Sequence, residues 1–263
     1  MSDASENDDA QSAESNDGAV KVPGRDAPKP LPKRFYKDVS VGEAADGGFN
    51  VLLDGRAVRT PAKQPLIVPT RALADAIAEE WAAQTENINP ATMPLSKLAI
   101  TAIDGVTGSR AEVAADIVRY AGSDLLCYRA EGPEALAVLQ AAAWDPILRW
   151  VEDETGARFY LAEGVMPVTQ SEDALERFGT LVAPYDAFGL TPLHVMTTLT
   201  GSAFIALAVA NGRLDAEQAW LAAHVDEDWQ IARWGIDEEA TERRVRRHRE
   251  MLAASRFLQL LSA

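Results

Sequence analysis

Apolar and polar residues alternate near residue 50, as they do along β-strands that have one buried face. Residues 35–41 mix aromatic and β-branched side chains, and residues 51–61 place the pair Asp54-Gly55 between two alternating runs. This pair favours the type I′ turn of a two-residue hairpin. Residues 66–68, held between two prolines, predict a further short strand at a sheet edge. The pattern therefore predicts a small antiparallel sheet near the N-terminus.

From residue 70 onward, apolar positions recur every three or four residues, as on one face of a helix. Polar residues that can cap a helix N-terminus precede several of these segments. The predicted caps are Thr70, Ser109 (with Glu112 in a capping box), Ser171 and Asp237. Further helices are predicted after Pro94, from Pro133 with a kink at Pro146, and from Thr191-Pro192. Strands followed by helices, without regular alternation of the two, favour an α+β fold over a doubly wound sheet.

A helical pattern of particular interest runs from Asp215, a good N-cap, to Gly235, which suits the left-handed position that ends a helix. Its spacing defines an apolar stripe and, beside it, a mixed strip. The stripe comprises Leu221, Val225, Trp229 and Ala232, and the strip comprises Glu227, Gln230 and Trp234. The last helix is expected to start at Asp237, with Glu238 and Glu239 in its first turn. The sequence thus predicts a helix–turn–helix corner with aromatic groups inside and carboxylates outside.

No charged residue stands between His194 and Arg213, and such a run raises the question of a membrane span. The run is short for a bilayer and contains hydroxyl residues and a glycine. A buried central helix is therefore the preferred interpretation.

The composition narrows the classes of partner. The 263 residues carry a net charge of −15, which argues against nucleic acid and anionic membranes as partners, because both require a positive surface. The single cysteine, Cys127, excludes an internal disulfide and a cysteine-based zinc site. It lies in an apolar run and is expected to be a small buried residue.

Residues 1–32 are interpreted as a disordered tail, because they are acidic, then proline-rich, and have little apolar content. They resemble neither a secretory signal nor a mitochondrial presequence. The predicted organisation is this tail, an α+β domain over residues 33–108 and a helical domain over residues 109–263.

Three short segments approach known functional motifs without completing them. Residues 200–202, Thr-Gly-Ser, lie in a helical segment and lack the nucleophile-elbow pattern of serine hydrolases. Residues 105–110 have the glycines of a phosphate loop but not its lysine. The basic run 243–249 resembles a nucleic-acid-binding strip, but glutamates stand four residues before two of its arginines, the favourable order for ion pairs within a helix. That run predicts an exposed helix face with paired charges.

His224 and Asp228 stand four residues apart, a spacing that could bring both side chains to one metal ion. Because no third ligand is in view, solvated neighbours are the favoured interpretation. The alternative is a small-molecule or metal-dependent enzyme of the helical domain, centred on these two residues. His194 is expected to be packed or hydrogen-bonded. A long chain without a recognisable polar constellation favours binding over catalysis.

Several sequence blocks, taken in order and spacing, resemble one family. The blocks are VLLDGRAVRTP (51–61), EEWAAQ (79–84), MPLSKLAITAID (93–104), CYRA (127–130), WDPILRW (144–150) and QIARWGIDE (230–238). Together they extend the resemblance from about Lys33 to Leu261. The family is that of the assembly chaperones of the F-type ATP synthase, which hold the alpha subunit of the catalytic head before the hexamer forms.

The resemblance implies a small β-rich N-terminal domain, a helical C-terminal domain, no cofactor and no enzymatic activity. It implies the alpha subunit as the partner, a monomeric chaperone without membrane insertion, and, since the acidic tail replaces a targeting sequence, a bacterial cytoplasmic member. The family's functional Trp-Gly-x-x-Glu element matches Trp234, Gly235 and Glu238, with Gln230 and Asp237 beside it. A second important family position matches Glu80 and Trp81.

Overall fold

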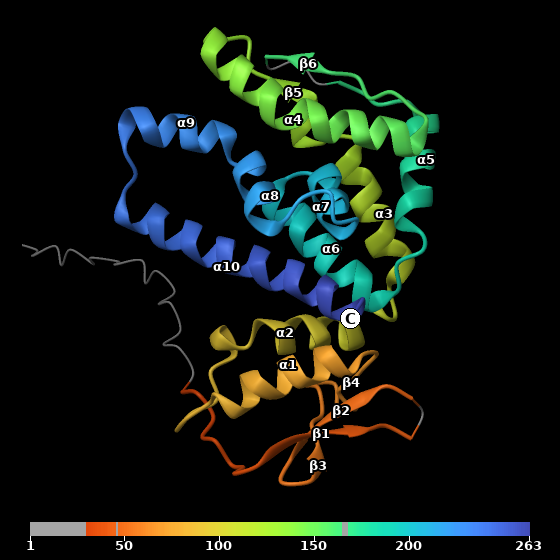
Figure 1. Cartoon of the computed structure of the whole chain (residues 1–263), viewed down its shortest axis with the longest axis vertical. Helices are drawn as coiled ribbons and strands as arrows, with labels where there is room; N and C mark the ends of the chain where they lie inside the picture. Colours follow the sequence, from red (N-terminus) through yellow and green to blue (C-terminus); the bar gives the residue numbers. More distant parts are fainter. Residues whose placement is uncertain (1–29, 46, 165–167) are drawn as a thin grey trace, which may run out of the picture. The chain divides into compact units, whose positions relative to one another are not determined.

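The computed structural model describes residues 30–45, 47–164 and 168–263, and residues 32–263 form one compact unit. A small antiparallel sheet near the N-terminus is followed by many helices, so the predicted α+β class is confirmed (Figure 1). Residues 1–29 of the predicted tail lie outside the described residues. The predicted division between residues 33–108 and 109–263 stays a prediction.

The sheet is built around strand β2, Phe49–Leu53, which pairs antiparallel with β1 (Val39–Glu43), β3 (Arg56–Ala57) and β4 (Ile67–Val68). Asp54 has φ 47° and Gly55 has φ 78°, the positive values that a type I′ turn needs at both positions. The predicted turn is confirmed. β1 begins later than residue 35, because the N–H groups of residues 37 and 38 donate to the Asp54 carboxylate, at 3.0 and 2.8 Å.

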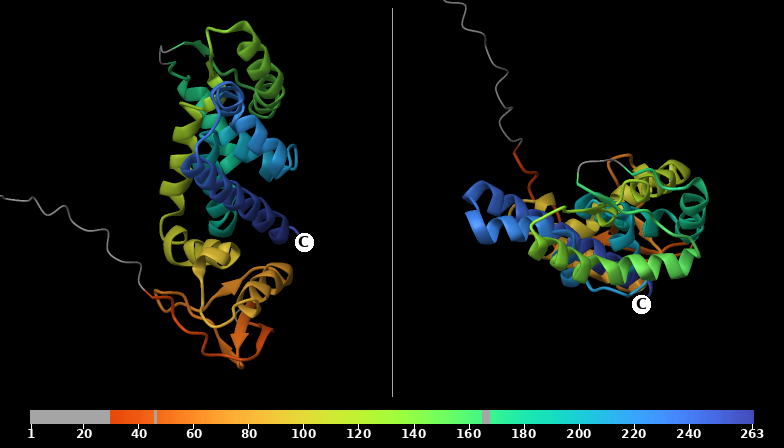
Figure 2. Two further views of the ribbon diagram at one scale, coloured as in Figure 1. Left: turned by 90° about the vertical axis from the view of Figure 1, so that its left-hand side faces the viewer. Right: turned by 90° about the horizontal axis from the view of Figure 1, so that it is seen from above.

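Helix α1, Arg71–Ala82, packs on the sheet, and helix α2, Pro94–Thr101, packs beside α1 (Figures 1 and 2). The Thr70 side chain accepts a hydrogen bond from Leu73 N at 3.2 Å, so the predicted cap is confirmed. Its hydroxyl also donates to Leu260 O of the last helix at 2.6 Å, across 190 positions of the chain. Residues 190 positions apart in the chain therefore meet at the start of α1.

The remaining elements are mostly helices. They are η1 (Pro90–Thr92), η2 (Ala102–Val106), α3 (Arg110–Ala121), η3 (Leu125–Cys127), α4 (Glu134–Thr155), α5 (Glu172–Val182), α6 (Ala187–Thr200), α7 (Ala203–Ala210), α8 (Ala216–Ala223), α9 (Val225–Trp234) and α10 (Glu238–Leu261), with a parallel strand pair of β5 (Tyr128–Arg129) and β6 (Ala162–Glu163). Nearly all of α7 is buried, and Trp144, Phe178 and Phe257 are fully buried as well. Cys127 is buried, as predicted. Among the described residues, none of the helices has both the length and the apolar character needed to cross a bilayer.

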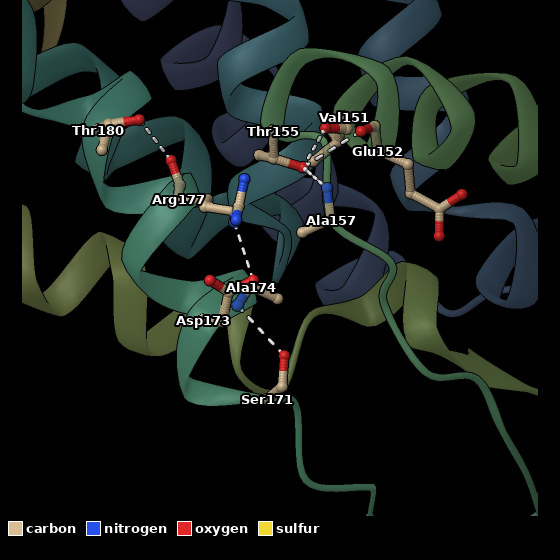
Figure 3. Close-up of polar contacts among 9 residues, drawn as sticks. All are labelled: Val151, Glu152, Thr155, Ala157, Ser171, Asp173, Ala174, Arg177 and Thr180. Atoms are coloured by element: carbon tan, nitrogen blue, oxygen red, sulfur yellow. Dashed lines mark hydrogen bonds and ion pairs between the residues drawn. The ribbon is translucent and has the colours of Figure 1, made fainter.

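The junction between α4 and α5 illustrates helix ends that local chemistry determines (Figure 3). Gly156 ends α4 with φ 63°, and Thr155 Oγ1 donates to Val151 O at 2.8 Å within the last turn. Ser171 Oγ accepts from Ala174 N at 3.2 Å and starts α5, so this predicted cap is confirmed. An exposed ion pair between Asp173 and Arg177 follows along the same helix.

Two helix starts differ from the prediction. Ser109 makes no capping bond, because its hydroxyl donates to Gly105 O of the preceding turn at 2.7 Å. The helix expected at Thr191-Pro192 begins four residues earlier, because Asp186 already accepts from Gly189 N at 2.9 Å. The central run is also two helices, since Gly201 takes φ 69° and ends α6. Ser202 Oγ then accepts from Ile205 N at 3.0 Å and starts α7.

Candidate functional site

The corner at the C-terminal part of the chain is made of α8, α9 and the start of α10. The capping box at Asp215 is complete, with reciprocal bonds to Gln218 at 2.7 and 3.0 Å. The single helix expected over 215–235 is broken at His224, whose backbone has φ −117° and ψ 20°. At the break, the His224 side chain bonds to the end of α8, because its Nδ1 donates to Trp220 O at 2.7 Å. Two short helices therefore replace one long helix.

His224 is buried and stacks on Trp220 with ring centroids 3.7 Å apart, so the expectation of a solvated pair with Asp228 is wrong. Burial lowers the pKa of His224. The Asp228 carboxylate instead forms an ion pair with Arg244 of α10. Within residues 30–45, 47–164 and 168–263, no group of three or more His, Cys, Asp or Glu side chains could hold a metal ion.

The basic run of α10 connects this helix to its neighbours. Arg244 contacts two acidic residues of α9. Besides its ion pair with Asp228, its guanidinium lies 3.1 Å from the Glu227 carboxylate. Arg247 donates to Leu199 O of α6 at 2.6 Å, and His248 lies 3.0 Å from Glu217 of α8. The predicted ion pair within the helix is present for Glu239 and Arg243, at 3.1 Å. The exposed face is confirmed for Arg243, Arg246 and Arg249, whereas Arg244, Arg247 and His248 are part-buried and connect α10 to the neighbouring helices.

The Trp-Gly-x-x-Glu element occupies the connection between α9 and α10. Trp234 is 77% exposed, so the expectation that the corner buries its aromatic groups is wrong at this position. Gly235, with φ 76° and ψ −179°, ends α9 in a conformation that L side chains rarely adopt. Asp237 Oδ1 accepts from Ala240 N at 2.8 Å and starts α10, which confirms this predicted cap. The first-turn residue Glu238 is exposed, and its carboxylate has no partner among the described residues.

Next to this element lies an open apolar groove of about 740 Å³ between α4, α8 and α9. The four residues of the predicted apolar stripe, Leu221, Val225, Trp229 and Ala232, all line it. Opposite them stand Leu139 and Pro146 of α4. The stripe is therefore a real common face, but Leu221 is 59% exposed and the stripe forms the wall of a groove instead of joining the core.

Glu80 and Trp81 lie elsewhere, on α1. The Glu80 carboxylate accepts hydrogen bonds from Leu95 N at 2.7 Å, from Ser96 N at 2.8 Å and from Ser96 Oγ at 2.7 Å. It thereby caps α2, and burial raises its pKa. Trp81 is half-buried and packs edge-on against Tyr36, with centroids 5.8 Å apart. No hydrogen bond or ion pair within the described part of the chain joins this pair to the Trp234 element.

A residue that the sequence reasoning missed is Asp124, which is fully buried. Its carboxylate accepts from Leu126 N and from Phe204 N, both at 3.0 Å, and so caps η3 and α7 together. Burial raises the pKa of Asp124 to about 7. An acidic residue directly before an apolar run is a recognisable N-cap signal, but its second partner lies 80 residues away.

The chain is similar to several known proteins. Residues 33–152 match the model of the ATP12 chaperone protein family. A solved structure of a chaperone candidate from Agrobacterium tumefaciens is 52% identical, with a TM-score of 0.85 over 88% of this chain and 87% of that one. Atp12 from Paracoccus denitrificans is 45% identical, with a TM-score of 0.83 over 88% of this chain and 98% of that one. The mitochondrial protein atp12 of Schizosaccharomyces pombe is 24% identical over 82% of this chain and 78% of the yeast protein.

Proposed function

The chain belongs to the ATP12 chaperone family and is a chaperone of ATP synthase assembly, and from this premise we propose that its client is the unassembled alpha subunit of the F-type enzyme. It binds this subunit, covers the surface that the subunit will later bury, and gives way to the beta subunit. An isolated subunit of a hexamer exposes apolar interface that would otherwise drive aggregation. Covering this interface needs shape, apolar surface and polar steering, and no chemical step.

The observation that carries the proposal is the exposed Trp234, followed four residues later by the exposed Glu238. A large exposed indole gives no stability to the chaperone alone, whereas tryptophan is among the residues that dominate protein interfaces. The Asp237 cap orders the start of α10 after the indole, and the Arg244 ion pairs connect α10 to the first turn of α9. We assign Trp234 and Glu238 to client contact, with Gln230 exposed beside them, and assign Gly235 and Asp237 to the turn that presents them.

Glu80 and Trp81 support the function indirectly in this proposal. They hold α2 and the segment before β1 against α1, so their loss would damage the scaffold. We further propose that the protein works as a monomer in the bacterial cytoplasm, without a cofactor and without catalysis. The bacterial origin of the two solved relatives and the chaperone names of the relatives support this description.

The test is suppression of aggregation. Isolated alpha subunit is diluted from denaturant, and its light scattering is followed with and without this protein. We expect suppression at near-stoichiometric amounts and without ATP. Serum albumin at the same concentration is the control. Scattering that this protein leaves unchanged, or that it lowers only while ATP is hydrolysed, would contradict the proposal.

A further inference from the structure

We infer that the apolar groove between α4, α8 and α9 receives an amphipathic helix of the client, with an apolar face toward the groove and basic residues beside that face. The identity of the client rests on the proposed function. The chemistry of the groove does not, because it follows from the residues that line it.

The lining of the groove is almost entirely apolar. Leu139 and Pro146 of α4 face Leu221, Trp229 and Ala232 of α8 and α9. Its only polar residues among those described are Gln218 and Asp228, and Asp228 is already paired with Arg244. Leu139 is 48% exposed and Leu221 59% exposed, so both present apolar surface that nothing in the described chain covers.

The occupant has to bring a backbone whose hydrogen bonds are already satisfied. The walls are faces of helices, whose backbone groups bond within their own helix, so they offer no row of free N–H and C=O groups. An extended segment in such a groove would bury unpaired peptide groups, each at a cost of a lost hydrogen bond. A helix satisfies these groups internally and lays its apolar side chains into the groove.

The charge beside the groove selects a basic occupant. The first turn of α9 carries Asp226, Glu227 and Asp228, and the structure gives this turn one guanidinium, that of Arg244. Arg244 contacts Glu227 and Asp228, whereas Asp226 accepts from Gln140 Nε2 of α4 at 2.7 Å. The three carboxylates of this turn therefore outnumber its one guanidinium, in a chain whose net charge is −15. Arg233, at the other end of α9, stacks on the Trp229 ring, with its guanidinium carbon 3.4 Å from the ring centroid. It keeps its positive charge, and the three carboxylates of the first turn still outnumber the guanidinium groups of Arg233 and Arg244. Lysine or arginine beside the apolar face of the occupant would complement this edge.

The groove also continues the surface assigned to the client. Ala232 lines the groove, and Trp234 and Ile236, both exposed, follow it along the chain. α9 has 10 residues and is therefore about 15 Å long. A client helix of about three turns would cover the length of this wall and end near Trp234.

A peptide tests the groove independently of any client. The probe is a fluorescent peptide of about 14 residues, with leucines at helical spacing and lysines elsewhere. A permuted peptide of the same composition, with leucine and lysine in strand-like alternation, is its control. We expect the helical peptide to bind at least about tenfold more tightly by anisotropy. Equal binding of both peptides would overturn the inference, since charge alone would then explain it.

The matched protein variants are Leu139→Asp and Val138→Asp. Both residues are exposed neighbours on α4, but only Leu139 lines the groove. Leu139→Asp, and separately Leu221→Asp, should weaken binding of the helical peptide about tenfold, whereas Val138→Asp should leave it unchanged. Circular dichroism verifies that each variant is folded. Undiminished peptide binding by folded Leu139→Asp and Leu221→Asp would overturn the inference.

The same variants are then measured against isolated alpha subunit. Weaker binding by Leu139→Asp than by Val138→Asp supports the inference for this client, and equal binding overturns it while the proposed function stands. If the wild-type protein binds no alpha subunit, the proposed function fails, and the peptide experiment decides about the groove. Self-association that both groove variants abolish would show that a second copy is the occupant, which also overturns the inference.

Discussion

Two acidic residues of this chain stand close to a tryptophan, and their surroundings are opposite. Glu80, directly before Trp81, directs its carboxylate to three donors of the segment Leu95–Ser96. Glu238, four residues after Trp234, has no partner among the described residues, and Trp234 is 77% exposed. A glutamate and a tryptophan therefore stabilise the fold at positions 80 and 81, whereas at positions 238 and 234 they are available to a partner. The difference lies in which groups the fold brings to each pair.

The largest loss of unfolding free energy is expected from the substitution Trp81→Ala. Truncation of a tryptophan in a core costs about 3–5 kcal/mol, and because Trp81 is half-buried we expect about 3 kcal/mol, measured by urea unfolding. Solubility and client binding should fall together with stability. An unfolding free energy within about 0.5 kcal/mol of wild type would place Trp81 with the contact residues and remove the contrast.

Glu80→Gln comes next. A glutamine cannot accept from all the N–H and O–H groups of Leu95 and Ser96, and buried donors left unpaired cost about 1–3 kcal/mol. We expect a loss of about 2 kcal/mol in unfolding free energy at neutral pH. Glu79→Gln, an exposed neighbour on the same helix, is the control and should change stability little. Equal stability of both variants would contradict the capping role.

The pH dependence sharpens this second prediction. Burial raises the pKa of Glu80, so the folded state holds this proton more tightly than the unfolded state. Stability from this group is therefore fully present below its unfolded pKa of about 4.3 and is lost as the pH rises through the raised folded pKa. Wild type should lose stability relative to Glu80→Gln over that rise. Parallel stability curves of the two proteins would show that burial does not govern this carboxylate.

Glu238→Lys should have the opposite result, with little loss of stability and a large loss of client binding. An acidic group in the first turn of a helix contributes about 0.3–1 kcal/mol through the helix dipole, so reversing the charge should reduce unfolding free energy by about that amount. Binding of alpha subunit, measured by pull-down and light scattering, should fall strongly. Glu239→Lys makes the same charge change at the next position, where the side chain pairs with Arg243, and is the control for general electrostatic repulsion. Equal loss of binding in both variants would leave Glu238 without a specific role.

Trp234→Ala should have the smallest effect on stability and a large effect on binding. An exposed side chain with few internal contacts contributes within about 0.5 kcal/mol to unfolding free energy. Buried tryptophans at interfaces, by contrast, are worth about 2 kcal/mol or more to binding. Normal binding of alpha subunit by folded Trp234→Ala would show that the contact surface lies elsewhere.

Local chemistry explains what the sequence could predict. The turn at Asp54-Gly55 and the caps at Thr70, Ser171 and Asp237 depend on residues at most three positions apart, and all four are present. The helix break at His224 was not predictable in this way, because the helical periodicity continues through it. That break is accompanied by a bond to Trp220 O and by ion pairs of α9 with the distant residue Arg244.

At the candidate site, too, residue spacing predicts the local structure but not the tertiary contacts. The spacing of Leu221, Val225, Trp229 and Ala232 correctly placed them on one face. Spacing cannot say whether another element covers that face, and in the structure α4 stands beside it and leaves a groove. Trp234 was expected inside for the same reason, since nothing in the periodicity distinguishes an aromatic residue that is packed from one that is displayed.

The hydrogen bond from Thr70 to Leu260 has a consequence for the order in which the protein is made. α10 also packs against α1, α2 and α6, so the outer side of the first helix stays uncovered until the last helix leaves the ribosome. At about 5–20 residues per second, the 190 positions between Thr70 and Leu260 take about 10–40 s to synthesise. During translation, α1 and α2 therefore wait with apolar surface exposed. A protein that we propose protects another subunit from aggregation would therefore expose apolar surface of its own during this interval.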